Sequence, residues 1–298
     1  MTLVDDVRSH CTAVAGGAQQ VRIDTEALEA AAAGPHPPQP ALDPERHYLE
    51  GSEADVATYL LTVGALNFGS GWFPTLRKRA AAGGQPLSGA STIAWAVTDR
   101  FRAHGPWTNA ELRAMRTGEL AVVLGQRADH ELMSLYAQAL RSLGAFLGER
   151  DALGLVAGAG GSAVALAAEL AGGMALFDDR GFFKKAQIAA ADLALGGVAR
   201  FGDLDRLTIF ADNLVPHVLR CDGVLVYDPR LAAHVDAGRP LRMGAQEREI
   251  RACAVVACRR IAERLGVNEA TLDHCLWNRG QAPAYKARPR HRCRTVFY

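Results

Sequence analysis

The sequence lacks the features that mark several large classes of protein. None of its six cysteines forms a CxxC pair, and Cys253 and Cys258 are five residues apart, the wrong spacing for adjacent helical metal ligands. Lys and Arg total 33 and Asp and Glu total 32, a balance that argues against a long-range field for duplex nucleic acid and leaves room only for a local basic patch. We therefore predict no metal site, no other cofactor and no direct nucleic-acid partner.

Long apolar runs are also missing. The N-terminal residues MTLVDDVRSHC carry acids early and contain no apolar core of signal-peptide length. The most apolar stretch, residues 153–176, is interrupted by Glu169 and several glycines, which favours a buried helix over a membrane span. We expect a cytoplasmic protein with no membrane partner, whose cysteines are buried, reduced thiols.

Helical signals dominate what is present. Ser52 and Asp55 have capping-box spacing before a run of apolar residues, and Thr108 with Glu111 repeats the pattern. Residues 130–147 place their apolar side chains on one helical stripe. Residues 246–265 do the same and end at Gly266, as a helix with a glycine C-cap does.

Strand signals are few, so the predicted fold class is all-α. Residues 224–227 allow one short strand or an extended loop, and nothing alternates strand with helix. Five prolines in residues 33–44 indicate an extended connector. We predict an N-terminal helical segment with this Pro-rich connector at 1–44, a main helical domain at 45–298, and an exposed loop at 80–84.

Residues 67–74, NFGSGWFP, form the first segment that can carry chemistry. Glycines let a backbone approach a ligand closely, and Trp72 offers a stacking face. A helix end with aromatic core residues explains the same composition equally well. The segment is not a phosphate-binding P-loop, because the required G-K-[ST] is absent.

Lys184 and Lys185 lie at the start of an expected helix, where the helix dipole favours anions rather than cations. In that position they could help the free N–H groups hold a phosphate. An ordinary solvated pair is the favoured interpretation when the two lysines are considered alone.

Asp212 lies in the apolar run LTIFADNLVP, two residues after Phe210. A carboxylate desolvated in such a run can act as a base, a nucleophile or the electrostatic partner of a cation. The alternative is an N-cap for a helix over 214–221, with Pro216 in its first turn. The two interpretations are compatible, because a capping position fixes the side chain.

Two further segments lie near the C-terminal end of the sequence. Trp277 and Asn278 follow an amphipathic helical pattern and combine an aromatic with a polar group. In residues 285–298, basic residues recur at every second position, which places five cations on one side of an extended chain. Because the run ends in the apolar TVFY, we expect it to be packed, with some arginines pairing acids and others facing an anion.

The blocks LNFGSGWFPTLRKR, FFKKAQIAAADL, LTIFADNLVP and YKARPRHRCRTVFY resemble the queuosine salvage family of queuosine 5′-phosphate N-glycosidases. The resemblance covers residues 45–298 and implies a helical architecture related to DNA glycosylases. It also implies that Asp212 is the catalytic aspartate and that Phe210 and His47 contact the base. Animal members place an aspartate and a tyrosine after the last tryptophan, where this sequence has Asn278 and Arg279.

Cleavage of an N-glycosidic bond builds positive charge on the ribose, which a nearby carboxylate stabilises. Queuine has a carbon where a purine has N7, so its departure relies on hydrogen bonds and stacking. Phe210, Trp72 and Trp277 are the expected stacking partners, and Asp192 and Asp273 are expected to accept from the base. The predicted function is therefore release of queuine from queuosine 5′-phosphate, a small-molecule substrate. The alternatives are a nucleic-acid base glycosylase and a non-catalytic deazapurine nucleotide-binding protein.

Overall fold

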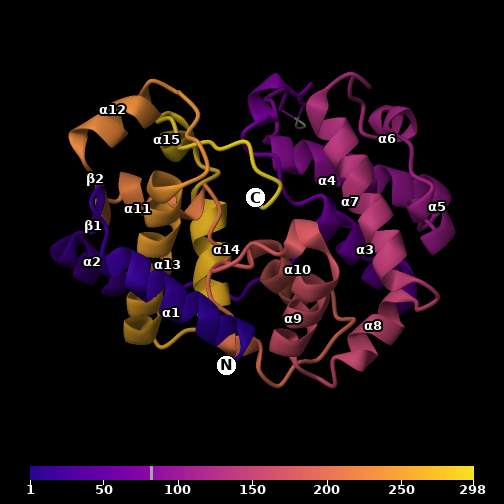
Figure 1. Cartoon of the computed structure of the whole chain (residues 1–298), viewed down its shortest axis with the longest axis horizontal. Helices are drawn as coiled ribbons and strands as arrows, with labels where there is room; N and C mark the ends of the chain where they lie inside the picture. The colour runs from indigo at the N-terminus through magenta and orange to yellow at the C-terminus, as the bar shows by residue number, and fades with distance from the viewer. Residues whose placement is uncertain (81–82) are drawn as a thin grey trace.

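Two groups of helices, each packed around its own hydrophobic core, make up the computed structural model of the chain (Figure 1). The structure describes residues 1–80 and 83–298, so the loop predicted at 80–84 falls partly outside the described residues. Within that part of the chain there are fifteen α-helices and one two-stranded sheet. The prediction of a mainly helical fold with few strands is confirmed.

The first group surrounds a core rich in buried aromatics such as Tyr59, Phe101 and Tyr136. The two buried tyrosine hydroxyls are satisfied, by Thr98 Oγ1 at 2.7 Å and by the Phe68 carbonyl at 2.8 Å respectively. The elements of this group are α3 (Glu53–Ala65), η1 (Phe73–Thr75), α4 (Gly89–His104), α5 (Asn109–Arg113), α6 (Thr117–Val123), α7 (Glu131–Leu147), α8 (Ala152–Gly158), α9 (Ala163–Gly173), η2 (Ala175–Phe177), α10 (Lys184–Leu195) and η3 (Leu204–Arg206).

The second group combines the start of the chain with its last third, which lie side by side in Figure 1. The long helix α13 packs against α1, α2, α11 and α14. The elements of this group are α1 (Leu3–Gly16), β1 (Val21–Ile23), α2 (Thr25–Ala32), α11 (Val215–Cys221), β2 (Leu225–Tyr227), α12 (Pro229–Asp236), α13 (Ala245–Leu265), α14 (Glu269–Arg279) and α15 (Pro283–Lys286).

Most local predictions from the sequence are confirmed. The capping boxes at Ser52 and Thr108 begin α3 and α5. Helix α7 covers the predicted 130–147 stripe with His130 as its N-cap, and α13 ends at Gly266, whose φ of 66° is the left-handed C-cap conformation. Strand β2 forms within residues 224–227 and pairs antiparallel with β1, a three-residue partner too short to be recognised in the sequence.

The single buried helix predicted over residues 153–176 is wrong. The chain forms α8 and α9 instead, which meet at an angle of 119°. The turn between them uses Gly160 and Gly161 with φ values of 60° and 78°, a conformation that only glycine adopts at little cost. Among the described residues no single helix has the length and apolarity to span a membrane, although this bent pair passes the same test of length and composition.

The N-terminal segment is packed into the main body. Val4 of α1 belongs to the first core, whereas Val7 and Cys11 belong to the second. All six cysteines are free, but Cys221 and Cys275 are half-exposed rather than buried as expected. The division at residue 45 stays a prediction.

Candidate active site

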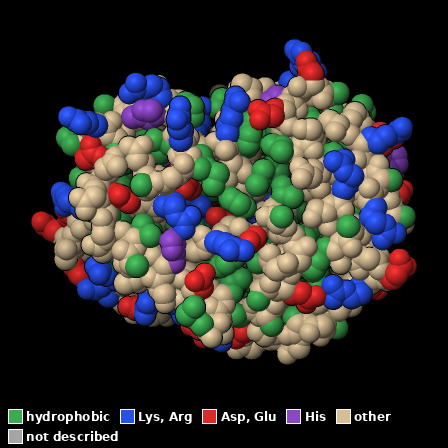
Figure 2. Space-filling model, in the orientation of Figure 1, with side chains coloured by type: hydrophobic (Ala, Val, Ile, Leu, Met, Phe, Trp, Pro, Cys, Tyr) green, Lys and Arg blue, Asp and Glu red, His purple; other side chains and the backbone are tan. Residues whose placement is uncertain are grey.

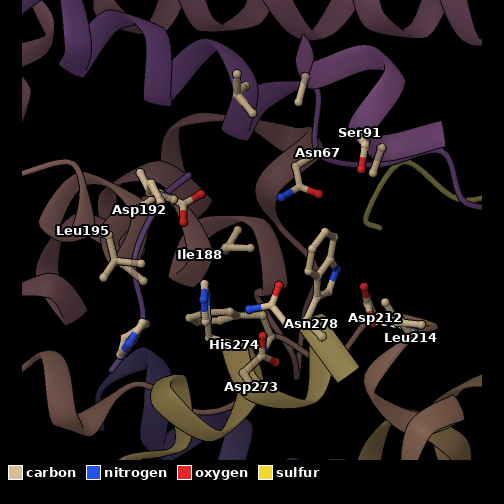
Figure 3. A pocket seen from close by; sticks show the side chains of 18 of the residues that line it. Asn67, Ser91, Ile188, Asp192, Leu195, Asp212, Leu214, Asp273, His274 and Asn278 are labelled. Carbon is tan, nitrogen blue, oxygen red and sulfur yellow. Dashed lines mark hydrogen bonds between the residues drawn. The ribbon is translucent and has the colours of Figure 1, made fainter. Parts of the chain in front are cut away.

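A cavity of about 840 Å³ lies between the two groups of helices. Its size is typical of sites that enclose a small organic ligand. One wall comes from α3, α4 and α10, and the facing wall comes from residues 210–214, α14 and the C-terminal segment (Figure 3). The predicted connector also contributes, because residues 39–44 line the cavity together with His47.

The segment before α11 brings Asp212 to this junction. Residues 207–211 are extended and buried, and their side chains alternate between the cores: Phe210 packs in the first core, whereas Ile209 and Ala211 pack in the second. Asp212 follows immediately and is half-buried on the cavity wall.

The carboxylate of Asp212 is held by the start of α11. Its Oδ1 atom accepts hydrogen bonds from the backbone N–H groups of Leu214 at 2.6 Å and Val215 at 3.1 Å. Asp212 lines the cavity, but the prediction that it is the N-cap of α11 is wrong: that position is Leu214, and Asp212 lies two residues before it. Oδ2 has no hydrogen-bond partner among the described residues, which leaves it available to a ligand.

Asp273 on α14 lies next to this segment. Its Oδ1 accepts from the backbone N–H of Phe210 at 2.9 Å, and the residue is only 5% exposed. Burial raises the pKa of Asp273 to about 8, and the charge of Asp212 acts in the same direction. With a pKa of about 8, the carboxyl group of Asp273 is mostly protonated at neutral pH, so it can donate a hydrogen bond.

Lys184 is the buried cation of this site. Its ammonium group donates to the carbonyl and side-chain oxygens of Asn67 at 3.1 and 2.7 Å. Burial lowers the pKa of Lys184, and the charges of Asp212, Asp273 and Asp192 oppose that shift. Removal from water raises the pKa of Asp192 to about 7, with Lys184 opposing it. Figure 3 shows Asp192 on α10 and Asp273 on α14.

Three further predicted residues line the cavity. His47 donates from Nδ1 to the Asp43 carbonyl at 2.9 Å, and burial lowers its pKa. Trp277 and Asn278, at the end of α14, are half-buried and exposed respectively. Arg279, the other residue that departs from the animal members, does not line the cavity and forms an ion pair with Asp222.

Trp72 and Lys185 were expected to contact the ligand, and the structure corrects both expectations. Trp72 is buried and donates from Nε1 to Glu131 at 2.7 Å, while its neighbour Phe73 lines the cavity. Lys185 is 1% exposed, with its Nζ 4.5 Å from the Phe68 ring centroid. Adjacent residues on a helix point about 100° apart, so Lys184 faces the cavity while Lys185 enters the core.

Some lining residues were not singled out by sequence reasoning. Asn67, which holds Lys184, and Phe73 lie within a recognised block, but their roles depend on neighbours distant in sequence. Arg290 and Tyr298 come from the C-terminal segment. Its alternating basic pattern predicted that some arginines face an anion, but not which ones.

A buried ion cluster fixes the backbone beside Asp212. Arg251 of α13 forms ion pairs with Asp179 and Glu247, and all three residues are at least 97% buried. Its Nε donates to the carbonyl of Ala211 at 2.8 Å. The guanidinium also lies over the Phe182 and Tyr298 rings, at 3.9 and 4.6 Å. Arg251 thus links α13, the turn before α10 and the C-terminal segment to the residue preceding Asp212.

Comparisons with known proteins agree with this geometry. The family model described as queuosine salvage protein matches residues 46–298. A protein named queuosine 5′-phosphate N-glycosylase/hydrolase from Sphaerobacter thermophilus is 33% identical over 307 residues, which cover 94% of each chain. Proteins of the same name from Dictyostelium discoideum and Mus musculus are 34% and 33% identical over 127 and 136 residues, or 39% of this chain and 40% of each relative. The chain belongs to the queuosine salvage protein family.

Proposed function

We propose that this chain is a hydrolase that cleaves the N-glycosidic bond of queuosine 5′-phosphate and releases queuine, without a cofactor. The observation that carries the proposal is the placement of Asp212. One of its oxygens is fixed by two backbone N–H groups, and the carboxylate lines a cavity large enough for a nucleotide. Three curated relatives carry the name of this activity.

Asp212 acts on the ribose side of the bond. The bond between the base nitrogen and ribose C1′ breaks with its electron pair moving to the base, which leaves an oxocarbenium-like ribose. The carboxylate stabilises this charge and orients the attacking water. Water supplies the hydroxyl group to C1′, and its remaining proton neutralises the base. The two N–H contacts hold the carboxylate in place, so little reorganisation is needed as the charge develops.

The departing base is held by groups on both walls. Phe210 and Trp277 offer aromatic faces, and His47 and Asn278 offer hydrogen-bonding groups along its edges. Because a 7-deazapurine cannot be protonated at position 7, negative charge must be spread by hydrogen bonds to the rest of the ring. Of Asp192 and Asp273, the acid that does not pair with the cationic arm of queuine keeps its raised pKa and, when protonated, can donate a hydrogen bond to the ring.

The cationic arm of queuine requires a carboxylate, and Asp273 and Asp192 are the two leading candidates. Both line the cavity with raised pKa values. An ammonium group beside either acid stabilises the ionised carboxylate. The two charges then form an ion pair, which offsets the cost of burying the carboxylate. A base without this arm gives no such compensation, and this difference selects queuine over guanine.

The proposed function is tested by incubating the protein with queuosine 5′-monophosphate and measuring free queuine by mass spectrometry. Release of queuine with multiple turnovers is the expected result. Tight binding without release would instead identify a non-catalytic nucleotide-binding protein. Release of a base from a modified duplex, but not from the free nucleotide, would identify a nucleic-acid glycosylase.

A further inference from the structure

Two cations near the cavity form no ion pair with any of the described residues. Arg290 lines the cavity, and among the described residues its guanidinium forms no hydrogen bond or ion pair. Its neighbours in the same segment are engaged: Arg288 pairs with Asp236, and Arg294 pairs with Glu131. Lys78 is half-buried, and within residues 1–80 and 83–298 its ammonium group forms no ion pair and lies 5.5 Å from the centroid of the Phe73 ring.

The fold brings these two cations together through a close contact between distant segments. The N–H groups of Gly69 and Ser70 donate to the carbonyl of Tyr298 at 3.0 and 3.3 Å. Gly71 lies so near the C-terminal segment that a Cβ atom there would be 2.4 Å from the Cys293 carbonyl oxygen. The loop that leads to Lys78 therefore packs directly on the segment that carries Arg290. Burial lowers the pKa of Lys78 to about 8, and the charge of Arg290 contributes.

Two more features indicate an anion at this place. The hydroxyl group of Ser70, which is 6% exposed, lines the same cavity without a hydrogen-bond partner among the described residues. Arg290 is also close enough to Asp212 for the two charges to interact, and the attraction opposes the effect of burial on the pKa of Arg290. A group attached to the ribose at Asp212 is therefore within reach of Arg290. Figure 2 shows Lys and Arg side chains along the edge of the molecule above the C-terminal segment.

We propose that Arg290 and Lys78, with the Ser70 hydroxyl, bind the 5′-phosphate of the substrate. This inference rests on the proposed function. A phosphate monoester carries close to two negative charges at neutral pH, which matches two unpaired cations. Lys184 is less suited, because two of its three N–H donors are used by Asn67, and the negative charge of Asp212 acts on it and would repel an anion bound there.

The test compares queuosine 5′-monophosphate with queuosine in wild-type, Arg290→Gln and Lys78→Gln proteins. A charge-assisted contact to the phosphate is lost in each variant, so kcat/KM for the nucleotide should fall at least about tenfold more than kcat/KM for the nucleoside. Lys286→Gln is the matched control, because it removes the same charge from an exposed site on the same segment. It should change neither substrate.

Binding of ribose 5-phosphate and of queuine, measured by calorimetry, gives a readout independent of turnover. Both variants should bind ribose 5-phosphate at least about tenfold more weakly than the wild type, and their affinity for queuine should be unchanged. An unchanged ratio of nucleotide to nucleoside, or equal losses for both, would overturn the phosphate site. If wild-type protein releases no queuine from either substrate, the proposed function fails, whereas the calorimetric comparison still decides whether Arg290 and Lys78 bind a phosphate ester.

Discussion

The two walls of the cavity are built in different ways. The wall from α3, α4 and α10 consists of helices packed on a hydrophobic core, and its residues are mostly apolar apart from Asn67, Lys184, Asp192 and the two serines at the start of α4, Ser88 and Ser91. The facing wall depends on non-helical backbone, at residues 210–214 and in the C-terminal segment, together with α14. It carries most of the groups expected to act on the ligand.

The two walls are therefore stabilised by different interactions. Helices hold their side chains in place through packing of their apolar faces. Irregular backbone inside a protein needs other partners for its polar groups, and here buried side chains supply them. Arg251 donates to the Ala211 carbonyl, Asp273 accepts from Phe210, and Asn213 donates to the His291 carbonyl at 3.0 Å. The position of the Asp212 carboxylate therefore depends more on polar contacts of the neighbouring backbone than on apolar packing.

The largest expected effect is on stability, from Arg251→Met. Asp179 and Glu247 would keep buried charges without their partner, and breaking such a cluster costs about 3–5 kcal/mol of unfolding free energy. Urea denaturation measures this loss. Replacing all three residues by apolar ones of similar volume should recover most of it. If the triple variant is no more stable than Arg251→Met, charge pairing is not what stabilises this wall.

Leu140→Ala is the change to compare with Arg251→Met, because it perturbs the hydrophobic core on which the wall of α3, α4 and α10 is packed. Leu140 is fully buried in the first core, and its truncation costs about 2–5 kcal/mol. The folded fraction of this variant should keep near wild-type turnover, because α7 supplies no cavity residue. The folded fraction of Arg251→Met should turn over more slowly, since the Ala211 carbonyl beside Asp212 loses its donor.

The second effect is on the rate, from Asp212→Asn. The amide keeps the volume and an oxygen for the Leu214 N–H, so folding and ligand binding should change little. Loss of a charge-stabilising group lowers kcat by about 10²–10³, and by more if the group also activates water. Single-turnover release of queuine measures this rate. A variant that retains more than about a tenth of wild-type turnover would contradict the role of Asp212.

The smallest effect concerns protons at Asp273. Burial raises the pKa of Asp273 to about 8, so its carboxyl group is mostly protonated at pH 7. A bound ammonium group favours the ionised carboxylate. Binding of queuine at pH 7 should therefore release up to about one proton. Calorimetry in two buffers of different ionisation enthalpy measures the release.

An Asp273→Asn variant should lose most of this proton release. Its affinity for queuine should fall more than its affinity for an analogue that lacks the amine. Phe210→Ala is the control, because lost stacking weakens both ligands by about 1–3 kcal/mol. If Asp192→Asn abolishes the proton release instead, the cationic arm pairs with Asp192. Equal weakening of both ligands by Asp273→Asn would show that Asp273 does not read the arm.

The same carboxyl groups affect stability. The pKa values of Asp192 and Asp273 are raised in the folded state above their ordinary value of 3.8, so the folded protein binds more protons than the unfolded chain between about pH 4 and pH 8. Their contribution to the unfolding free energy therefore decreases as pH rises through this window.

Periodicity and capping residues determined much of the secondary structure. The stripes over 130–147 and 246–265 became α7 and α13, because local spacing alone decides which face of a helix is apolar. The prediction of one helix over 153–176 was wrong because the stretch contains several glycines, and the sequence does not show which of them adopt the positive φ that turns the chain, as Gly160 and Gly161 do.

Site residues were predictable where a motif joined chemistry to position. Asp212 and Phe210 stand in one recognisable block, and both line the cavity. Adjacent candidates such as Lys184 and Lys185 could not be separated, because the rotation that aims one into the cavity and the other into the core depends on which helix face α3 covers.

The sequence by itself determined that the chain is mainly helical and which family it belongs to. It also identified Asp212 as the candidate catalytic carboxylate. Only the tertiary structure decided which cations are free for a ligand. Arg288, Arg290 and Arg294 are equivalent in an alternating run, but the first and last find acids on α12 and α7. Arg290 lines the cavity and forms no ion pair in the part of the chain that the structure describes. The physical reason is that pairing of charges depends on distances between segments far apart in the chain, and a local pattern does not contain those distances.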